Sequence, residues 1–456
     1  MTWRDESSWC LPGEVAGRAS GSLSPLVVTD IAARIWAARN AYLTRLPVAE
    51  IAEIVDCVVG LWLGPESPWL HAAARRIAAV TPYSEAMVRT GLTRLLGGCR
   101  KEALLSLLEE ELGDPGVLDG FRPRRAVGGS HRACGPALTT HIFSGNVPGL
   151  PAISLIQALL VKSASLGKPA SEELVFPAMF ARSIASVDAK LAASVAILPW
   201  PGGDPAMEQA AFAASEAVVA YGSDLAVESI RARLPPGVGF VGHGHRVSFG
   251  VIGRESLDSG ALDTLAERVA YDVSLFDQQG CVSAHVLYVE RGGGVPPESF
   301  AARVANAMAA FERGMPSGEV SLEEAAAIQQ VRAEVELREM REEPVRQWGS
   351  PGGTAWTVIY DDDPSFVPSC LNRVVRVTPV TDLREIPSLV RPFRRYLQTV
   401  GVAMSRERQV RLAEALAPLG ACRICAIGEM PHPPLAWHHD GGFNLLPLLR
   451  WTAIEE

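Results

Sequence analysis

The stretch LTTHIFSGNVPGLPAISLIQALLVKSASLGKPAS, residues 138–171, decides the fold of this chain. A short apolar run over 138–143 is followed by a Gly- and Pro-containing turn and then by an apolar helical run over 150–161. A second short run, 163–166, ends in Gly-Lys-Pro. A strand, a helix and a second strand in this order predict two parallel strands covered by a helix, with ligand-binding loops at the carboxyl ends of the strands.

The same alternation extends on the C-terminal side. It predicts helices over 172–185, 207–214 and 224–233, and strands over 195–198 and 217–221. A second set predicts helices over 261–276, 298–313, 322–343, 383–399 and 407–416, and strands over 284–290, 355–360 and 374–380. Such repeats are typical of mostly parallel sheets with helices on both faces. We therefore expect an α/β protein with two lobes in series, residues 121–255 and 256–430.

The chain before the first strand follows another pattern. From residue 27 to about 112, apolar residues recur at three- and four-residue spacing, which predicts helices. A basic stretch with two adjacent glycines, residues 122–130, then separates this region from the first lobe. We expect a helical N-terminal region over 1–120 and, after the second lobe, a C-terminal tail over 431–456.

Composition and charge exclude several classes of protein. Of the 456 residues, 48% are hydrophobic and 20% are charged, which is typical of a globular chain. The net charge of −9 argues against a nucleic-acid partner. The longest near-continuous apolar run, 150–161, is far shorter than the ~20 residues of a membrane span, and the polar residues 1–8 lack the apolar core of a signal peptide. We expect a cytoplasmic protein without a membrane span.

Three predicted strand ends carry side chains suited to ligand binding. Asn146 follows the first strand, where its amide could donate to an oxyanion or to its own turn. Lys168 ends the second strand, where its ammonium could reach a ribose or a phosphate or lie in a plain surface turn; Ser171 would cap the next helix without adding negative charge. Gly222 and Ser223 end the fourth strand, and Ser223 could bind a phosphate or simply cap a helix.

The eight cysteines are scattered and indicate no disulfide framework. Cys281 differs from the others because it follows a long predicted helix and a glycine, in a polar turn before an apolar strand. A thiol in such a turn can be exposed and partly ionised, as a nucleophile requires; the alternative is a buried structural cysteine. The sequence contains no P-loop, Gly-x-Gly-x-x-Gly or Gly-x-Ser-x-Gly motif.

Two segments contain residue types that bind metals. The segment 422–438 has the spacing Cys-x2-Cys-x6-His-x5-His, but its cysteines lie in a strand-like run, where this separation places them on opposite faces. His243 and His245 would lie on one side of an extended chain and could donate to a ligand, but they have no Cys or carboxylate neighbour in sequence. We therefore expect no metal site.

Seven segments, in their order along the chain, resemble the LuxC-type acyl-CoA reductase (acyl-protein thioester reductase) family of the aldehyde dehydrogenase superfamily. These are HIFSGNVPG (141–149), LVKSASLGKPAS (160–171), LPWPGGD (198–204), VAYGSD (219–224), GHRVSFGV (244–251), FDQQGC (276–281) and WHHDG (437–441). The resemblance covers roughly residues 137–451. It implies an aldehyde-dehydrogenase-like fold with two Rossmann-like lobes, the first binding NADPH and the second carrying a nucleophilic cysteine.

The resemblance also implies roles for individual residues. Cys281 matches the nucleophile, and Asn146 matches the side chain that completes the oxyanion hole. Lys168 matches the lysine that holds the adenosine ribose, and Ser223, after its glycine, matches the serine that contacts the pyrophosphate. Ser171 stands where many NAD-dependent members carry a glutamate, so a negative charge is removed and NADPH is favoured.

The reaction implied is NADPH-dependent reduction of a fatty acyl thioester, on coenzyme A or on acyl-carrier protein, to the aldehyde through an acyl-cysteine. Residues 241–248 lack the general-base glutamate of hydrolytic members, which counts against an aldehyde dehydrogenase that forms an acid or acyl-CoA. A non-catalytic subunit of an acyl-transfer complex is the other alternative. The candidates for the proton donor are His245, His285 and His439. We also expect a homo-oligomer.

Overall fold

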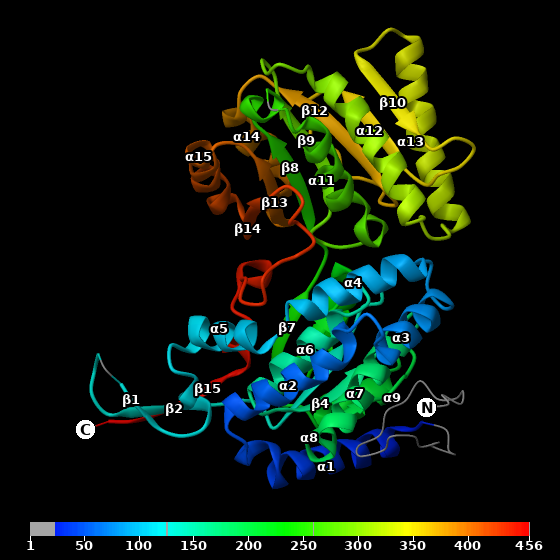
Figure 1. Ribbon diagram of the computed structural model, residues 1–456. Helices are drawn as coiled ribbons and strands as arrows, with labels where there is room; N and C mark the ends of the chain where they lie inside the picture. The colour runs from blue at the N-terminus through cyan, green and yellow to red at the C-terminus, as the bar shows by residue number, and fades with distance from the viewer. Residues whose placement is uncertain (1–22, 125, 259, 456) are drawn as a thin grey trace.

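Two largely parallel sheets, one above the other in Figure 1, organise the molecule. This computed structural model describes residues 23–124, 126–258 and 260–455. The polar segment 1–8, expected to lack a signal peptide, lies outside the described residues. The expected α/β class with parallel sheets is confirmed. Within the described part of the chain, no helix is long and apolar enough to cross a membrane.

The first sheet has five parallel strands in the order β5-β4-β3-β6-β7. The strands are β3 (Leu138–Ile142), β4 (Ala164–Lys168), β5 (Val195–Ile197), β6 (Ala217–Tyr221) and β7 (Gly239–His243). The helices between them are α6 (Leu150–Leu160), α7 (Val175–Val187), α8 (Ala189–Ala192), α9 (Pro205–Ala213) and α10 (Asp224–Ala232). The strand order reverses between β3 and β6, so the loops after these two strands flank a crevice at the carboxyl edge.

The second sheet has seven strands in the order β10-β11-β12-β9-β8-β13-β14, and only the β10–β11 pair is antiparallel. The strands are β8 (Val247–Ile252), β9 (Ala284–Glu290), β10 (Val345–Gly349), β11 (Thr357–Asp361), β12 (Val374–Val380), β13 (Leu397–Ala403) and β14 (Arg423–Ala426). Its helices are α11 (Leu262–Ser274), α12 (Pro297–Gly314), α13 (Leu322–Met340), α14 (Ile386–Val390) and α15 (Arg406–Leu416). Strand β8 lies within 121–255, the range expected for the first lobe, yet it belongs to this sheet.

The helix predicted over 383–399 is wrong in its second half. The segment starts with the short helix α14, but Leu397–Ala403 form β13, which lies between β8 and β14. Six of its seven residues are buried, because both faces of the strand are covered. Because the polar residues Gln398 and Thr399 are buried with the apolar ones, the run has no period of two, and its sequence does not distinguish a strand from a helix.

The predicted N-terminal helices are confirmed and cover both faces of the first sheet. They are α1 (Pro25–Ala41), α2 (Val48–Leu63), α3 (Pro68–Ala78), α4 (Glu85–Gly97) and α5 (Lys101–Leu112). Helix α1 packs with α9 on one face, and α2–α5 share a core with α6 and α7 on the other. In that core the fully buried Trp62 contacts Phe176 and Phe180 and donates to the hydroxyl of Ser183 at 2.9 Å.

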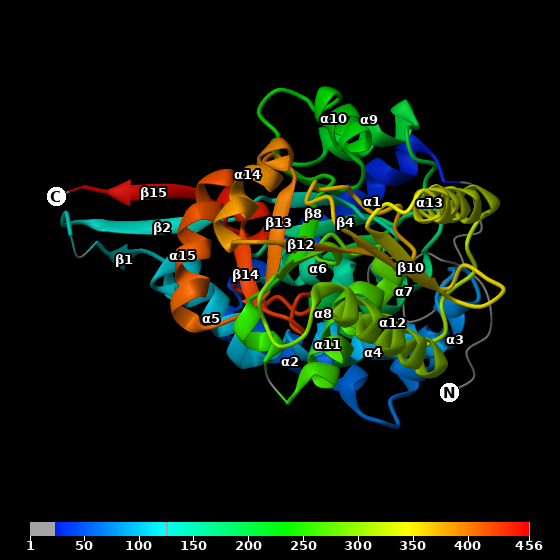
Figure 2. The ribbon, with the colours of Figure 1, turned by 90° about the horizontal axis from the view of Figure 1, so that it is seen from above.

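A three-stranded antiparallel sheet extends from the body of the molecule (Figure 2). Its strands are β1 (Arg122–Pro123), β2 (Ser130–Cys134) and β15 (Arg450–Ile454). The sequence analysis predicted none of these strands. The C-terminal segment descends from the second sheet past the first to reach β15, so it lies against both halves of the molecule (Figure 1).

Candidate active site

A cavity of about 880 Å³ brings together side chains that lie far apart in the sequence. Asn146 and Ser223 reach its wall from the loops after β3 and β6, and Cys281 from the loop before β9. His439 reaches the cavity from the C-terminal segment, and Leu95 from α4. The cavity is therefore bordered by both sheets, by the N-terminal helices and by the C-terminal segment.

Cys281 lies on a tightly turned loop after α11. The three consecutive residues Phe276, Asp277 and Gln278 have positive φ values of 53°, 50° and 65°, so the helix ends abruptly and the chain reverses into β9. Non-glycine residues adopt this conformation only where their surroundings enforce it. The hydroxyl of Ser248 donates to the Cys281 carbonyl at 2.8 Å, which fixes the loop to β8.

Arg373 holds this loop in its conformation through buried ion pairs. Its side chain is 1% exposed, and its Nε donates to Asp277 at 2.7 Å while Nη1 donates to Glu312 at 2.5 Å. The side-chain amide of Gln278 donates to the carbonyls of Ala284 and Val374 at 2.8 and 2.9 Å. The loop before Cys281 is therefore held by buried polar contacts on both sides.

The Cys281 thiol is partly exposed at the cavity wall. The atoms packed around it desolvate the thiolate and raise the thiol pKa to about 12, and the negative charge of Asp440 adds to this shift. The amide of Gln398 and the charge of Arg246 act in the opposite direction. This shift favours the neutral thiol over the partly ionised one, which is the opposite of what the polar turn suggested.

Asn146 lies beside the same loop. Its side-chain nitrogen donates to the carbonyl of Gln279 at 2.8 Å, and its backbone carbonyl accepts from the hydroxyl of Tyr83 at 2.6 Å. An amide nitrogen carries two protons, so one N–H remains for a ligand in the cavity. The structure thus brings Asn146 and Cys281 to one wall.

Lys168 is buried at the end of β4, with a relative exposure of 7%. Within the described part of the chain, its ammonium has no hydrogen-bond or ion-pair partner. Burial lowers the pKa of this ammonium, and the carboxylates of Glu172 and Glu208 partly oppose that shift. Glu208 is itself paired with Arg233 at 2.8 Å. A buried cation without a partner fits a site for a ligand's hydroxyl or phosphate oxygens.

The predicted helix cap at Ser171 is wrong. Helix α7 begins only at Val175, and the carboxylate of Glu173 accepts from the backbone N–H groups of Val175 and Phe176 at 2.9 and 2.7 Å. Two acceptor contacts from one carboxylate leave no role for a hydroxyl at the helix start. Ser171 is instead exposed on the loop that follows Lys168.

Gly222 and Ser223 lie at the carboxyl end of β6, beside the crevice in the first sheet. The Ser223 hydroxyl accepts from the backbone N–H of Ala226 at 3.3 Å and caps α10, and Gly222 donates to the carbonyl of His243 at 3.1 Å. Both residues line the cavity. The capping function is confirmed, and the free N–H groups of this helix end are available to an anion.

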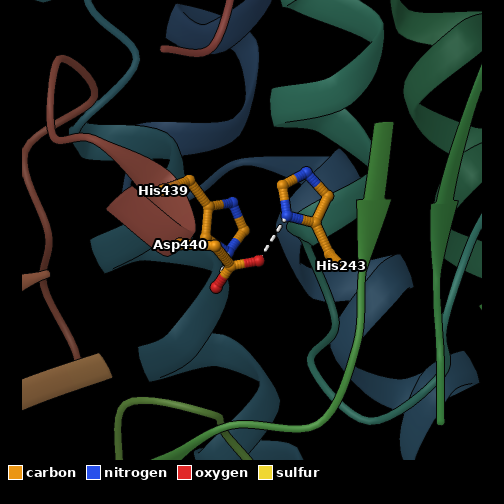
Figure 3. A group of neighbouring side chains, drawn as sticks. All are labelled: His243, His439 and Asp440. Atoms are coloured by element: carbon orange, nitrogen blue, oxygen red, sulfur yellow. Dashed lines mark hydrogen bonds and ion pairs between the residues drawn. The ribbon is translucent and has the colours of Figure 1, made fainter. Parts of the chain in front are cut away.

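His243, at the end of β7, forms a cluster with two residues of the C-terminal segment (Figure 3). Its Nδ1 lies 2.8 Å from the Asp440 carboxylate, and the ring of His439 stacks on it at 4.1 Å. Asp440 also accepts from Arg246 at 2.9 Å and from Gln398 at 2.7 Å. Burial raises the pKa of this carboxyl, but these hydrogen bonds outweigh burial and hold the pKa well below its usual range.

The cluster of His243, His439 and Asp440 is compact enough to hold a metal ion. The guanidinium of Arg246, however, already pairs with Asp440 and would repel a cation at the same carboxylate. The Cys-His segment 422–438, which the sequence analysis rejected as a metal site, forms no ligand cluster in the described part of the chain: Cys422 lies against backbone carbonyls, and His432 pairs with the hydroxyl of Tyr271 at 2.7 Å.

The three predicted proton donors have different surroundings. His285 is buried, its Nδ1 accepts from the backbone N–H of Ser369 at 3.1 Å, and burial lowers its pKa to about 4. Burial lowers the pKa of His439 to about 3. His245 is exposed, and its backbone N–H donates to Asp224 at 2.8 Å. All three line the cavity.

This two-lobed arrangement is the aldehyde dehydrogenase fold. The chain matches the NADP-dependent glyceraldehyde-3-phosphate dehydrogenase of Bacillus halodurans C-125, solved in complex with NADP, with a TM-score of 0.72 and 13% identity over 95% of this chain and 92% of that one. It matches an oxidoreductase from Marinobacter aquaeolei with a TM-score of 0.71 and 14% identity over 95% and 91% of the two chains. At these identities the likeness establishes the fold alone.

Sequence similarity identifies one family among the proteins that share this fold. The model of the acyl-CoA reductase (LuxC) family matches residues 43–451, so this chain belongs to that family of oxidoreductases. It is 25% identical to the long-chain acyl-protein thioester reductase of Aliivibrio fischeri over 423 residues, which are 90% of this chain and 83% of that protein. Its identity to the enzyme of the same name from Photorhabdus laumondii is 24%, with the same two coverages. The match includes most of the N-terminal helices, where the sequence analysis found no signature.

Proposed function

We propose that this protein reduces a fatty acyl thioester to the aldehyde with NADPH, through an acyl-cysteine on Cys281. The observation that carries the proposal is the joint placement of Cys281 and Asn146 on one cavity wall, linked by the 2.8 Å hydrogen bond from Asn146 to Gln279. Membership of the acyl-CoA reductase family and similarity to proteins named long-chain acyl-protein thioester reductases support it.

The acyl-transfer step uses the residues of that wall. Cys281 attacks the thioester carbonyl, and the negative charge that develops on the carbonyl oxygen is stabilised by the Cys281 N–H and by the second N–H of the Asn146 amide. The hydrogen bond to Gln279 orients this amide before the substrate binds. The thiol of coenzyme A or of a carrier protein then leaves, and the acyl group remains on Cys281.

The cofactor binds along the carboxyl edge of the first sheet. The unpartnered ammonium of Lys168 holds the adenosine ribose, and the N-terminus of α10, with Gly222 and Ser223, binds the pyrophosphate. The exposed hydroxyl of Ser171 adds no negative charge where a 2′-phosphate would lie, which favours NADPH. When bound, NADPH supplies the hydride that reduces the acyl carbon.

The apolar part of the cavity accommodates the acyl chain. Its walls include side chains from α4, α6, the end of α11 and the C-terminal segment, among them Leu95, Leu150, Ile153, Leu275 and Leu435. A fatty acyl chain lying against these side chains would exchange water for apolar contacts.

The test is NADPH oxidation dependent on tetradecanoyl-CoA. Wild-type protein should turn over, Cys281→Ala should lose the activity, and Cys57→Ala, which removes an exposed thiol of α2, should keep it. The reverse reaction, tetradecanal plus NADP, should require coenzyme A. Oxidation of the aldehyde without coenzyme A would instead indicate a hydrolytic aldehyde dehydrogenase.

We propose that the expected homo-oligomer forms through the projecting sheet of β1, β2 and β15. All five residues of β15 are exposed, and the strand lies at the edge of its sheet, so its free backbone groups can pair with a second copy. Light scattering of the intact protein should give a multiple of 48.8 kDa. Thr452→Pro, at the centre of β15, should shift the mass toward the monomer; a monomeric wild-type protein would contradict the proposal.

A further inference from the structure

We propose that His243, oriented by Asp440, is the group that takes the proton from Cys281 and returns it to the departing thiol. This inference rests on the proposed function. It assigns a residue to the proton transfer from Cys281, for which the oxyanion hole supplies no base. Neither His243 nor Asp440 was among the proton donors expected from the sequence.

The hydrogen bonds define the protonation of the His243 ring. Its Nδ1 lies 2.8 Å from a carboxylate oxygen of Asp440, and an ionised carboxylate only accepts, so Nδ1 carries the ring proton. Nε2 is then left with a lone pair and is the basic atom. Figure 3 shows Nδ1 turned toward the carboxylate.

Asp440 is itself fixed from two other directions. Arg246 donates to Oδ1 through its Nε at 2.9 Å, and Gln398 donates to the same oxygen at 2.7 Å. The opposite oxygen, Oδ2, is therefore the one that accepts from Nδ1 of His243. Arg246 also donates to the carbonyl of Arg395 at 3.1 Å, and Gln398 is 1% exposed, so the carboxylate is anchored to the second sheet.

The groups that anchor Asp440 also surround the nucleophile. The charges of Asp440 and Arg246 act on the Cys281 thiol, and the amide of Gln398 interacts with it directly. Because burial raises the pKa of the Cys281 thiol to about 12, the neutral thiol predominates near pH 7, and a base beside it would speed acylation. His243 lines the same cavity and offers the missing base.

The other histidines of the cavity are less suited to this step. His285 already accepts a backbone N–H at Nδ1, and His439 has no carboxylate within hydrogen-bond distance, its Nε2 lying 4.0 Å from Asp440. His245 is exposed, and its backbone N–H, not its ring, donates to Asp224. Of the four, His243 is therefore the histidine with an oriented ring and a free ring nitrogen.

Each proton transferred in the proposed reaction passes through His243. The Cys281 proton moves to Nε2 as sulfur attacks, and Nε2 returns it to the thiolate of coenzyme A when the C–S bond of the substrate breaks. Reduction of the acyl carbon leaves an oxyanion, which collapses to the aldehyde and expels the Cys281 thiolate. That thiolate accepts one proton from solvent through His243, so each turnover consumes one proton.

The charged and titratable groups around the His243 ring determine what a pH profile reports. They are Tyr221 from β6 and His439 and Asp440 from the C-terminal segment, with Arg246 paired to Asp440 and His245 two residues away; Cys281 lines the same cavity. Tyr221 stays neutral because burial raises its pKa to about 12. Asp440 stays ionised because its hydrogen bonds hold the pKa of this carboxyl well below its usual range.

The experiment measures acylation of Cys281 by tetradecanoyl-CoA without NADPH, using quenched-flow mass spectrometry from pH 5.5 to 9. We expect His243→Gln to slow acylation at pH 7 by about 10²- to 10³-fold, within the range of a lost general base. The remaining rate should rise tenfold per pH unit as thiolate forms, whereas the wild-type rate should level off. Asp440→Asn should give a smaller loss and a shifted profile.

His71→Gln is the matched control, since it removes an exposed histidine of α3 that does not line the cavity and should leave the wild-type profile unchanged. Thermal unfolding of each variant separates loss of fold from loss of the base. If His243→Gln keeps the wild-type rate and profile, the inference is overturned while acylation of Cys281 still stands. The inference also falls if EDTA abolishes wild-type acylation and Zn²⁺ restores it, because His243 would then bind metal.

Discussion

The side-chain nitrogen of Asn146 lies 2.8 Å from the carbonyl oxygen of Gln279, which is 133 residues further along the chain and two residues before Cys281. This hydrogen bond joins the first sheet to the loop that carries the nucleophile. Because Asn146 is anchored on its other side by the hydroxyl of Tyr83, its amide is oriented before any substrate arrives. Preorganised donors of this kind stabilise a developing oxyanion more than mobile ones do.

Asn146→Ala should lower the rate of acyl transfer to Cys281 by about 10²- to 10³-fold, because one oxyanion donor is lost. Single-turnover acylation by tetradecanoyl-CoA measures this directly. Tyr83→Phe removes only the hydroxyl that holds the Asn146 carbonyl and should have a much smaller effect. An Asn146→Ala rate equal to that of Tyr83→Phe would show that the amide does not act on the oxyanion.

Lys168→Met should weaken NADPH binding and at the same time stabilise the protein without cofactor. A buried ammonium without a partner costs folding free energy, so replacing it by an apolar side chain of similar length raises Tm. NADPH fluorescence titration and thermal unfolding measure the two effects.

Lys162→Met provides the contrast to that variant. Lys162 is also 7% exposed, but its ammonium pairs with Asp119 at 2.6 Å. Its loss should lower Tm and leave cofactor affinity unchanged. A drop in Tm for Lys168→Met with unchanged NADPH affinity would show that Lys168 is a structural residue.

Glu290 should make stability depend on pH below about 5. The carboxylate is fully buried; burial raises its pKa, but hydrogen bonds from Arg254 and Arg408, at 2.7 and 2.6 Å, outweigh burial and lower the pKa to about 2. A carboxyl whose pKa is depressed by folding contributes stability that is present above its unfolded pKa and is lost as pH falls toward 2.

Urea unfolding of Glu290→Gln tests that contribution. The variant leaves two arginines facing a neutral amide, so its free energy of unfolding at pH 7 should be about 3 kcal/mol lower than that of the wild type, the lower end for a broken buried pair because Arg254 is partly exposed. The difference should shrink as the pH falls from 5 to 3. A difference in free energy of unfolding that stays constant over this range would show that lost packing, not lost charge, destabilises the variant.

Local sequence patterns predicted most elements that position the site. The turn that carries Asn146, the strand end at Lys168 and the cap at Ser223 follow from residues adjacent in sequence, and helix or strand periods identify the elements around them. The sequence did not predict that Glu173 caps α7 in place of Ser171. Whether a carboxylate near the start of a helix accepts from the backbone depends on its side-chain conformation, which the residue type alone does not determine.

The cluster around Asp440 could not be predicted in the same way. Its members His243, Arg246 and Gln398 lie up to 197 residues from Asp440, and their contacts depend on how the C-terminal segment crosses between the sheets. Gln398 lies on β13, which was itself predicted as a helix. The sequence also did not show that packing would raise the pKa of the Cys281 thiol, since desolvation depends on tertiary contacts.

The central claim is that Cys281 is acylated by the thioester substrate. Intact-protein and peptide mass spectrometry after incubation with a mixture of saturated acyl-CoAs, without NADPH, tests it most directly. One acyl group should appear on the peptide that contains Cys281, in wild-type protein and in Cys57→Ala but not in Cys281→Ala, and added NADPH should remove it as aldehyde. Acylation of another residue, or an acyl-free protein that still oxidises NADPH with acyl-CoA, would contradict the claim.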